Sequence, residues 1–294
     1  MGDGFAVLGE RSVAEHTEEV QRQIRASPQD AGLRLALCHF LALRGEWQRA
    51  DDQLKQAVKL DPSFTPASAA CALALKGERQ RSAFWAGDAA QAPAVLGERA
   101  AWVDDLIAAA TMPGDKAADA AALRESARDA APAVRGTLVG VDRSDARPAE
   151  TVDGEPAQRT AFAWLCDGDV RLGTALEVFT PAGHAWLPLP SVRRLKFQRP
   201  RHLVDLLWAP VEAELADGRG VAVLVPVRYP GALDALDDGL LLGRRTDWLP
   251  LAGEEQYAGL GQRTLISEAG DHPLLDIRTI EFDAPGAQQQ EGAA

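Results

Sequence analysis

Residues 31–62 read AGLRLALCHFLALRGEWQRADDQLKQAVKLDP, a pattern that predicts two consecutive helices. Residues 31–44 are apolar on nearly every side, which is typical of a helix buried between neighbours. Gly45 interrupts that pattern. Apolar residues then recur at helical spacing from Trp47 until Asp61 and Pro62 end the run. Small side chains in both segments would allow the two helices to approach each other closely.

This helix pair resembles one tetratricopeptide repeat. Pro28 and Pro62 are 34 residues apart, which is the period of that repeat. The residues that fall at the repeat's spacing are Leu37, Cys38, Leu41, Gly45, Trp47, Ala50, Leu54, Ala57 and Pro62. Only one complete copy is clear, whereas a stable stack usually needs at least about three repeats. We therefore expect the following helices to cap it.

The flanking sequence extends the helical region in both directions. Ser12-Val-Ala-Glu15 has the form of a capping box, in which the serine and the glutamate each satisfy a backbone N–H of the first turn. Further helices are expected at 65–81, 98–110 and 115–133. Together these segments predict a tetratricopeptide-like helical domain over residues 1–133.

The second half has the pattern of a β-rich domain. Residues 134–157 are polar and contain proline and glycine, so they are expected to be a linker. Short apolar or β-branched runs with turn residues between them follow at 160–166, 175–180, 192–198, 211–216, 221–228 and 274–282. A short helix is expected at 202–208 and a disordered tail at 285–294. The expected fold class is α+β, with a β-rich domain over residues 158–284.

The composition excludes several classes of function. The chain carries a net charge of −12, so neither nucleic acid nor an anionic membrane is an expected partner. The first ten residues lack the cationic and apolar parts of a signal peptide. Three widely spaced cysteines fit a reducing compartment. The expected location is the cytoplasm.

One short motif suggests metal chemistry. Asp167 and Asp169 flank a glycine, and with Glu177 they could hold a divalent cation. The favoured interpretation is a turn, because aspartate and glycine between apolar runs are common at hairpins. Arg171 could then pair with Glu177 across the turn.

No phosphate-binding loop, G-x-S-x-G or C-x-x-C motif occurs in the sequence, and we expect no cofactor, metal site or catalytic residue.

Six residues are candidates for binding another protein. Arg228 and Tyr229, like Arg244 and Trp248, place a guanidinium near an aromatic ring. Such pairs occur both as interface anchors and as cation–π contacts inside one fold, and the sequence leaves the two interpretations open. Arg34 and His39 are polar positions on the expected inner helix. Stacked helices form a groove that can receive a partner's helix, so the helical half is the favoured location.

The second half also contains an ordered series of short sequence motifs. They are Ala161-Phe-Ala-Trp-Leu-Cys-Asp-Gly-Asp-Val-Arg-Leu-Gly173, Glu177-Val178, Trp186, Asp205-Leu-Leu-Trp208, Pro226-Val-Arg-Tyr-Pro-Gly231, Gly243-Arg-Arg-Thr-Asp-Trp248 and Gly261-Gln-Arg263. In this order, behind a helical half, they resemble the ImpE/SciE/TagJ family. The resemblance implies a non-enzymatic accessory protein of the bacterial type VI secretion system. It also implies two partners, namely the small subunit of the contractile sheath, bound through a helix of that subunit, and the AAA+ ATPase that recycles the sheath.

Two other functions remain open at this stage. A helical-repeat scaffold could serve a different assembly, since the repeat pattern alone names no partner. A metal-dependent enzyme could use Asp167, Asp169 and Glu177. Metal binding would distinguish the enzyme from both scaffolds.

Overall fold

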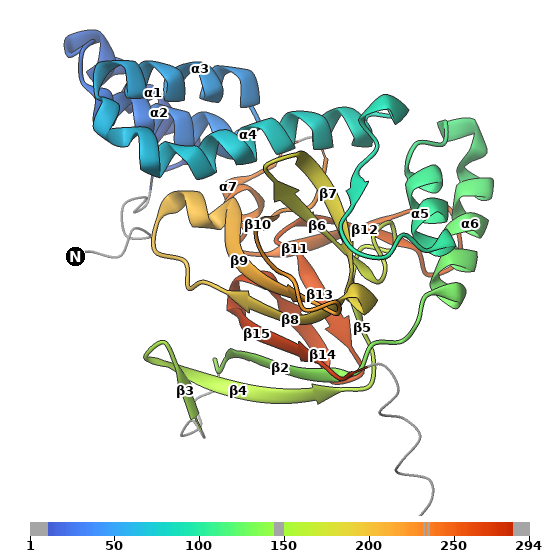
Figure 1. Cartoon of the computed structure of the whole chain (residues 1–294). Helices are drawn as coiled ribbons and strands as arrows, with labels where there is room; N and C mark the ends of the chain where they lie inside the picture. The colour runs from blue at the N-terminus through green and yellow to red at the C-terminus, as the bar shows by residue number, and fades with distance from the viewer. Residues whose placement is uncertain (1–10, 144–149, 232, 234–235, 285–294) are drawn as a thin grey trace, which may run out of the picture.

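The computed structural model describes residues 11–143, 150–231, 233 and 236–284 (Figure 1). The expected disordered tail at 285–294 lies outside these ranges. The fold is α+β, as predicted. Its helices are α1 (Val13–Ala26), α2 (Ala31–Leu43), α3 (Trp47–Leu60), α4 (Thr65–Trp85), α5 (Ala101–Ala110), α6 (Ala117–Ala130) and the short α7 (Asp238–Leu241). No helix in these ranges has both the length and the apolarity that crossing a bilayer requires.

The first three helices form as the sequence predicts. The capping box before α1 is confirmed, since Ser12 N donates to Glu15 Oε2 at 2.7 Å and Glu15 N donates to Ser12 Oγ at 3.1 Å. Gly45 adopts a φ of +74° between α2 and α3, a conformation that glycine reaches without strain. α4 extends to Trp85, four residues beyond the expected end at 81.

A ten-stranded sheet makes up most of the second half. Its order is β1-β7-β6-β10-β9-β8-β15-β2-β4-β3, antiparallel at every pairing except β1 with β7. The strands are β1 (Ala94–Val95), β2 (Gly136–Val141), β3 (Glu150–Val152), β4 (Glu155–Phe162), β6 (Ala175–Thr180), β7 (Gly183–Pro188), β8 (Val192–Phe197), β9 (Trp208–Leu215), β10 (Gly220–Pro226) and β15 (Ile277–Phe282).

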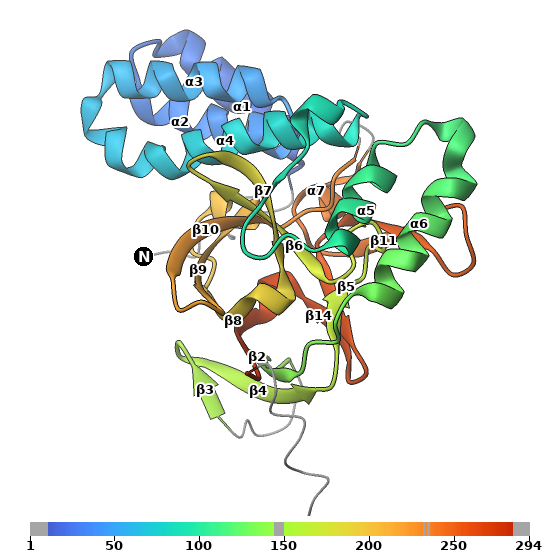
Figure 2. The same cartoon turned by 45° about the vertical axis from the view of Figure 1, so that its right-hand side comes forward.

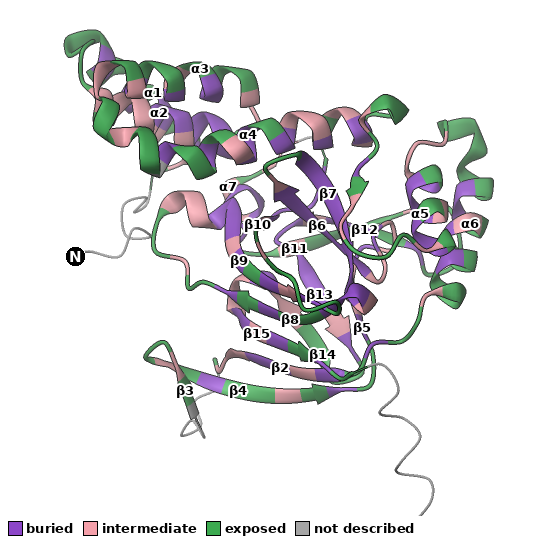
Figure 3. Ribbon diagram, in the orientation of Figure 1, coloured by how far each residue is buried: buried purple, intermediate pink, exposed green. Residues whose placement is uncertain are grey.

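Two smaller sheets pack beside it. One joins β11 (Thr246–Pro250) to β12 (Tyr257–Gly261), and the other has the order β14-β13-β5, from Gly270–Pro273, Thr264–Ser267 and Leu165–Asp167. The main apolar core is formed mostly by the ten-stranded sheet, together with Leu165 of β5 and Leu265 of β13. Figure 3 shows buried residues concentrated along β6, β7 and β9.

The helices cover the sheet closely. α4 lies across β6 and β7, where a Cβ on Gly77 would come within 2.4 Å of a ring carbon of Phe179. Glycine at this position therefore lets the helix approach the strand. The α5–α6 hairpin stands at the side of the molecule, next to β5 and β11 (Figure 2).

The expected division into two domains with a linker needs correction. Residues 134–157 contain β2, β3 and the start of β4, and β2 is an inner strand between β15 and β4. Proline, glycine and aspartate around residues 142–156 obscured this pattern. The cores are also shared across residue 133, because Phe179, Leu207, Trp208 and Leu242 pack with α1–α4. The helical half is therefore not a body separate from the sheet.

Two smaller expectations also change. Only Leu203–Leu206 of the expected helix at 202–208 is helical, as one 3₁₀ turn, and Trp208 already begins β9. The expected strand at 274–282 begins with another 3₁₀ turn, Leu274–Asp276, before β15. Strands β1, β7 and β11–β14 were not predicted. All are six residues long or shorter, and β7, β11, β12 and β14 end in glycine or proline.

A candidate functional site between helices and sheet

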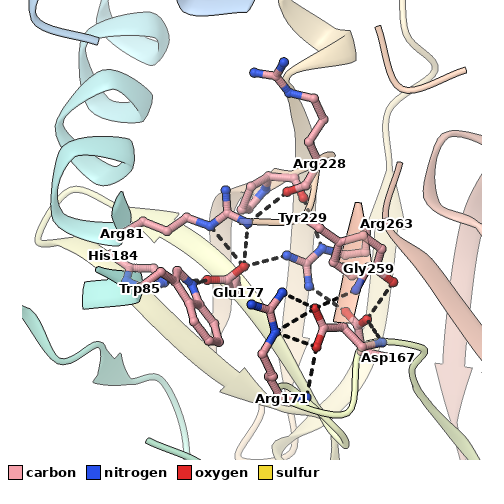
Figure 4. Close-up of polar contacts among 12 residues, drawn as sticks. Arg81, Trp85, Asp167, Arg171, Glu177, His184, Arg228, Tyr229, Gly259 and Arg263 are labelled. Carbon is pink, nitrogen blue, oxygen red and sulfur yellow. Dashed lines mark hydrogen bonds and ion pairs between the residues drawn. The ribbon is translucent and has the colours of Figure 1, made fainter. Parts of the chain in front are cut away.

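Glu177 on β6 is the centre of a buried charged network (Figure 4). One carboxylate oxygen accepts hydrogen bonds from Arg81 Nε at 3.0 Å, Arg81 Nη2 at 2.7 Å and Arg263 Nη2 at 2.6 Å. The other oxygen accepts from Trp85 Nε1 at 2.8 Å and lies 3.1 Å from His184 Nε2. Glu177 is fully buried, so these protein groups replace the water that its charge would otherwise need.

Arg263 extends the network to a second carboxylate. Its Nη1 donates to Asp167 Oδ2 at 2.6 Å, and both side chains are fully buried. The other oxygen of Asp167 accepts from the Tyr229 hydroxyl at 2.8 Å and from Asp169 N at 2.9 Å. The last contact is the local bond of an aspartate turn, so the interpretation of 167–169 as a turn fits this geometry.

Asp169 forms a third ion pair. Its carboxylate accepts from Arg171 Nε at 2.9 Å and Nη2 at 2.5 Å, and from Gly259 N at 3.1 Å. The guanidinium of Arg171 also stacks 4.8 Å above the ring of Trp85. The expected pair between Arg171 and Glu177 is therefore wrong, because Arg171 reaches the nearer carboxylate while Arg81 and Arg263 neutralise Glu177.

Arg228 has a different role from the other buried arginines. Its Nη1 donates to the carbonyls of Leu43 at 2.6 Å and Leu241 at 3.0 Å, and its Nη2 donates to Ala42 O at 3.3 Å. These carbonyls belong to the last turns of α2 and α7, where a cation is favourable. Arg228 and Tyr229 are both buried, which agrees with the interpretation that this pair makes contacts inside the fold.

The network shifts several pKa values. Burial alone would raise the pKa of Glu177, but Arg81, the hydrogen bond with His184 and Arg263 together hold it well below its ordinary value. Burial raises the pKa of Asp167 to about 6 despite the opposing effect of Arg263. Burial lowers the pKa of Arg228 to about 10, because no carboxylate pairs with it directly.

This arrangement leaves little room for metal chemistry. Both oxygens of Asp167, Asp169 and Glu177 are engaged by donors of the protein. The residues that the structure describes contain no group of three or more histidine, cysteine, aspartate or glutamate side chains able to hold a metal ion. The site is best understood as an internal clamp between α4 and the sheet.

The remaining candidate residues do not form one surface. Arg34 and His39 are half-buried on α2, and Arg34 donates to Gln53 Oε1 at 3.1 Å and to Pro28 O at 3.3 Å. Arg244 is exposed just before β11. Trp248 on β11 is 38% exposed, with its ring 5.8 Å from that of Tyr229.

The sequence patterns indicated neither the role of Arg81 nor the burial of the charged network. Arg81 lies in the polar stretch Lys76–Ser82, which has the composition of a solvated helix face. A signal was nevertheless present, because Phe84 and Trp85 lie three and four residues after Arg81 and make that side of the helix apolar. Trp85 donates to Glu177, and Phe84 packs edge-to-face on Trp186 at 5.9 Å.

Comparison with known proteins places these residues in a family. The ImpE protein family matches residues 159–281, a range that contains Asp167, Glu177, Tyr229 and Arg263. The type VI secretion system accessory component TagJ of Pseudomonas aeruginosa is 37% identical over 269 residues, which cover 91% of this chain and 86% of TagJ. The crystal structure of protein VPA1032 from Vibrio parahaemolyticus superposes with a TM-score of 0.76 at 26% identity, covering 92% of this chain and 94% of that one. The chain therefore belongs to the ImpE/TagJ family of type VI secretion system accessory proteins.

Proposed function

We propose that this protein is a non-enzymatic adaptor that acts in the bacterial cytoplasm. It binds the small subunit of the type VI contractile sheath through an amphipathic helix of that subunit, and it links the subunit to the AAA+ ATPase that recycles the sheath. The observation that carries this proposal is the similarity to TagJ, which extends over 91% of the chain and so includes both the helices and the sheet.

The buried network supports a role as an adaptor. An adaptor that connects two partners must hold its binding surfaces in a fixed arrangement. Arg81 and Glu177 join α4 to β6, and Arg228 joins the end of α2 to the segment after β10. Buried, fully hydrogen-bonded groups of this kind favour one arrangement over others. They are suited to keeping surfaces on the helices and on the sheet in register.

The same contacts weigh against catalysis at this site. A general base must be within hydrogen-bond reach of a substrate proton. Glu177 and Asp167 are instead surrounded by arginine, tyrosine and histidine from the protein itself. Their burial and saturation support a structural role for both carboxylates.

A pull-down with purified components tests the proposal. The full-length protein is immobilised and offered the small sheath subunit, the ATPase, or both. We expect it to retain the sheath subunit, and to retain more ATPase when the sheath subunit is also present. A sheath subunit whose helix has its apolar anchors changed to alanine is the matched control, and its retention should drop steeply.

Three outcomes of the pull-down would each contradict a different part of the proposed function. If the full-length protein retains no sheath subunit at concentrations up to about 100 μM, the adaptor proposal is rejected. If the sheath subunit binds but the ATPase is never enriched, the protein is a sheath-binding factor without the proposed link. Equal retention of the wild-type and alanine-substituted helices would reject the helical mode of binding.

A further inference from the structure

A hollow lies on the side of the molecule and reaches Asp167 at the edge of the charged network. Its volume is about 440 Å³, and it separates the α5–α6 hairpin from β5 and the loop that follows it. Figure 2 shows this hairpin and β5 side by side. The lining is mainly apolar and includes Leu106, Ala127, Ala131, Trp164, Val170 and Ile266. We call this hollow the α6 groove.

The two walls of the α6 groove suit a helix. On α6, Ala127 and Arg128 lie three and four residues after Arg124, and Ala131 follows at the end of the helix, so the four residues share one face. The side chains of the two alanines are small, so that face of the helix is shallow. Opposite them stands Trp164, one of four large apolar side chains that the described residues expose, at 39%. An exposed tryptophan beside an apolar hollow is typical of a protein-binding surface.

The α6 groove also contains a buried arginine that forms no salt bridge with the described residues. Arg124 is only 8% exposed, and its Nε donates to Gln256 Oε1 at 2.7 Å and its Nη2 to Ala252 O at 3.2 Å. Within the described ranges it forms no ion pair, unlike Arg81 and Arg263. Burial and the neighbouring Arg171 lower the pKa of Arg124, and the carboxylate of Asp169 opposes them only in part.

We propose that the α6 groove, rather than the first helix pair, receives the amphipathic helix of the sheath subunit. Apolar side chains of that helix lie between α6 and Trp164, and an acidic side chain beside them pairs with Arg124. The inference rests on the proposed adaptor function for the identity of the partner. It replaces the expected location around Arg34 and His39 with a specific surface.

The charge and composition of the surroundings favour this occupant. A carboxylate on the incoming helix would give Arg124 the partner that it lacks, and a buried charge gains most from such a pair. Helix-in-groove binding uses apolar anchors three or four residues apart, which matches the spacing along α6. Residues 285–294 of this chain have no apolar side chain larger than proline, so they are a poor occupant. Most apolar residues of α2 are buried in the core that α2 shares with α1, α3 and α4, so they are not free to contact a partner.

Calorimetric titration of the purified full-length protein with the small sheath subunit tests the inference. Trp164→Ala and Arg128→Glu should each weaken binding, with a loss of at least about tenfold for Trp164→Ala. Trp248→Ala is the matched control, because Trp248 is exposed to nearly the same extent, 38% against 39%, and does not line the α6 groove. It should leave the affinity within about twofold. Circular dichroism establishes that each variant is folded.

The proposed contact between Arg124 and a carboxylate of the sheath helix is tested by the dependence of affinity on salt. Arg124→Gln should reduce the dependence of affinity on salt between about 50 and 300 mM, because it removes the charge that meets the carboxylate. Arg124→Glu should bind poorly, and a change of one acidic residue of the sheath helix to lysine should restore binding. A structural role for Arg124 alone would give neither effect.

Each outcome supports or rejects the α6 groove. If Trp164→Ala and Arg128→Glu bind like the wild type, the inference is wrong while the adaptor function stands. Loss of binding in Trp248→Ala alone would place the site at β11. If the wild-type protein is a dimer that Trp164→Ala converts to a monomer, the occupant is a second copy of this chain. If the wild-type protein does not bind the sheath subunit at all, both the inference and the proposed function fail.

Discussion

Arg81 on α4 donates two hydrogen bonds to the same carboxylate oxygen of Glu177 on β6, from Nε at 3.0 Å and from Nη2 at 2.7 Å. The two residues are 96 positions apart, and their side chains are 5% and 0% exposed. Arg263 binds that oxygen from the opposite side. The contact therefore fixes the helices to the sheet at a point where both charges have lost their water.

Removing the charge of Glu177 should destabilise the protein strongly. Glu177→Gln keeps the size of the side chain but leaves Arg81 and Arg263 without their shared anion. Breaking a buried ion pair on one side costs about 3–5 kcal/mol, because the remaining charge stays buried. Urea denaturation at neutral pH measures the loss in the free energy of unfolding.

Glu281→Gln is the matched control for that substitution. Glu281 pairs with Arg194 at 3.3 Å, but both side chains are about half exposed. Exposed pairs contribute little to stability, so this change should barely move the denaturation midpoint. Equal midpoints for the two variants would contradict the central role of Glu177.

The raised pKa of Asp167 predicts a pH dependence. Its pKa is about 6 in the folded protein, against an ordinary value of 3.8. Between these values the folded state binds more protons than the unfolded state, so the contribution of Asp167 is greatest below about pH 4 and is lost as the pH rises through about 6. A shift of this size corresponds to about 3 kcal/mol. The difference in unfolding free energy between wild type and Asp167→Asn should therefore fall by about 2 kcal/mol between pH 4.5 and 7, as measured by urea titration at several pH values.

A constant difference across this range would show that Asp167 keeps an ordinary pKa. The opposite slope would mean that Arg263 and Tyr229 outweigh burial and lower the pKa of Asp167. Glu177 acts in the opposite direction, because its lowered pKa makes its contribution disappear as the pH falls. Comparing variants with the wild type isolates the contribution of Asp167 from that of Glu177.

Local patterns in the sequence were sufficient for the elements that depend on local contacts. The capping box of Ser12 and Glu15 and the break at Gly45 follow from neighbouring residues, and both occur as expected. The buried network could not be derived in this way. Arg81 and Glu177 each look ordinary within their own segments, and only the tertiary fold brings them together. β2 was missed for a related reason, since its six residues include two glycines and its pairing partner β15 is more than 130 residues away.

Packing at Tyr229 gives a prediction that does not involve charge. A Cβ on Gly259 would lie 2.2 Å from two ring carbons of Tyr229, which the Asp167 hydrogen bond holds in place. Gly259→Ala should therefore lower the thermal midpoint clearly, by a mechanism of overpacking. Gly220→Ala is the control, because nothing lies within 4 Å of the added carbon and the φ angle at Gly220 is not positive. If both variants melt at the same temperature, the position of Tyr229 is not constrained as the structure implies.

Metal titration tests the enzyme alternative directly. Every oxygen of Asp167 and Asp169 already accepts a hydrogen bond from the protein. A divalent cation would have to displace Arg263 or Arg171 from a buried position. We therefore expect calorimetry with Mg²⁺, Ca²⁺ or Zn²⁺ to show no stoichiometric site that Asp167→Asn or Asp169→Asn removes. A site of micromolar affinity that both substitutions abolish would revive the metal-dependent enzyme.

The last prediction concerns the two halves of the chain expressed separately. A fragment of residues 1–133 keeps Arg81 but loses Glu177, and it exposes the surfaces of Phe84 and Trp102 that pack with Trp186 and Tyr229. Because apolar burial and ion pairing are both shared across residue 133, this fragment should not unfold cooperatively when purified alone. Produced together with residues 134–294, it should copurify as a complex whose circular dichroism matches that of the intact chain. Thermal denaturation followed by circular dichroism makes the comparison. A cooperative transition of fragment 1–133 alone, near the midpoint of the full-length protein, would show that the helices form an independent domain and that the ion pair of Arg81 and Glu177 is not needed to hold them.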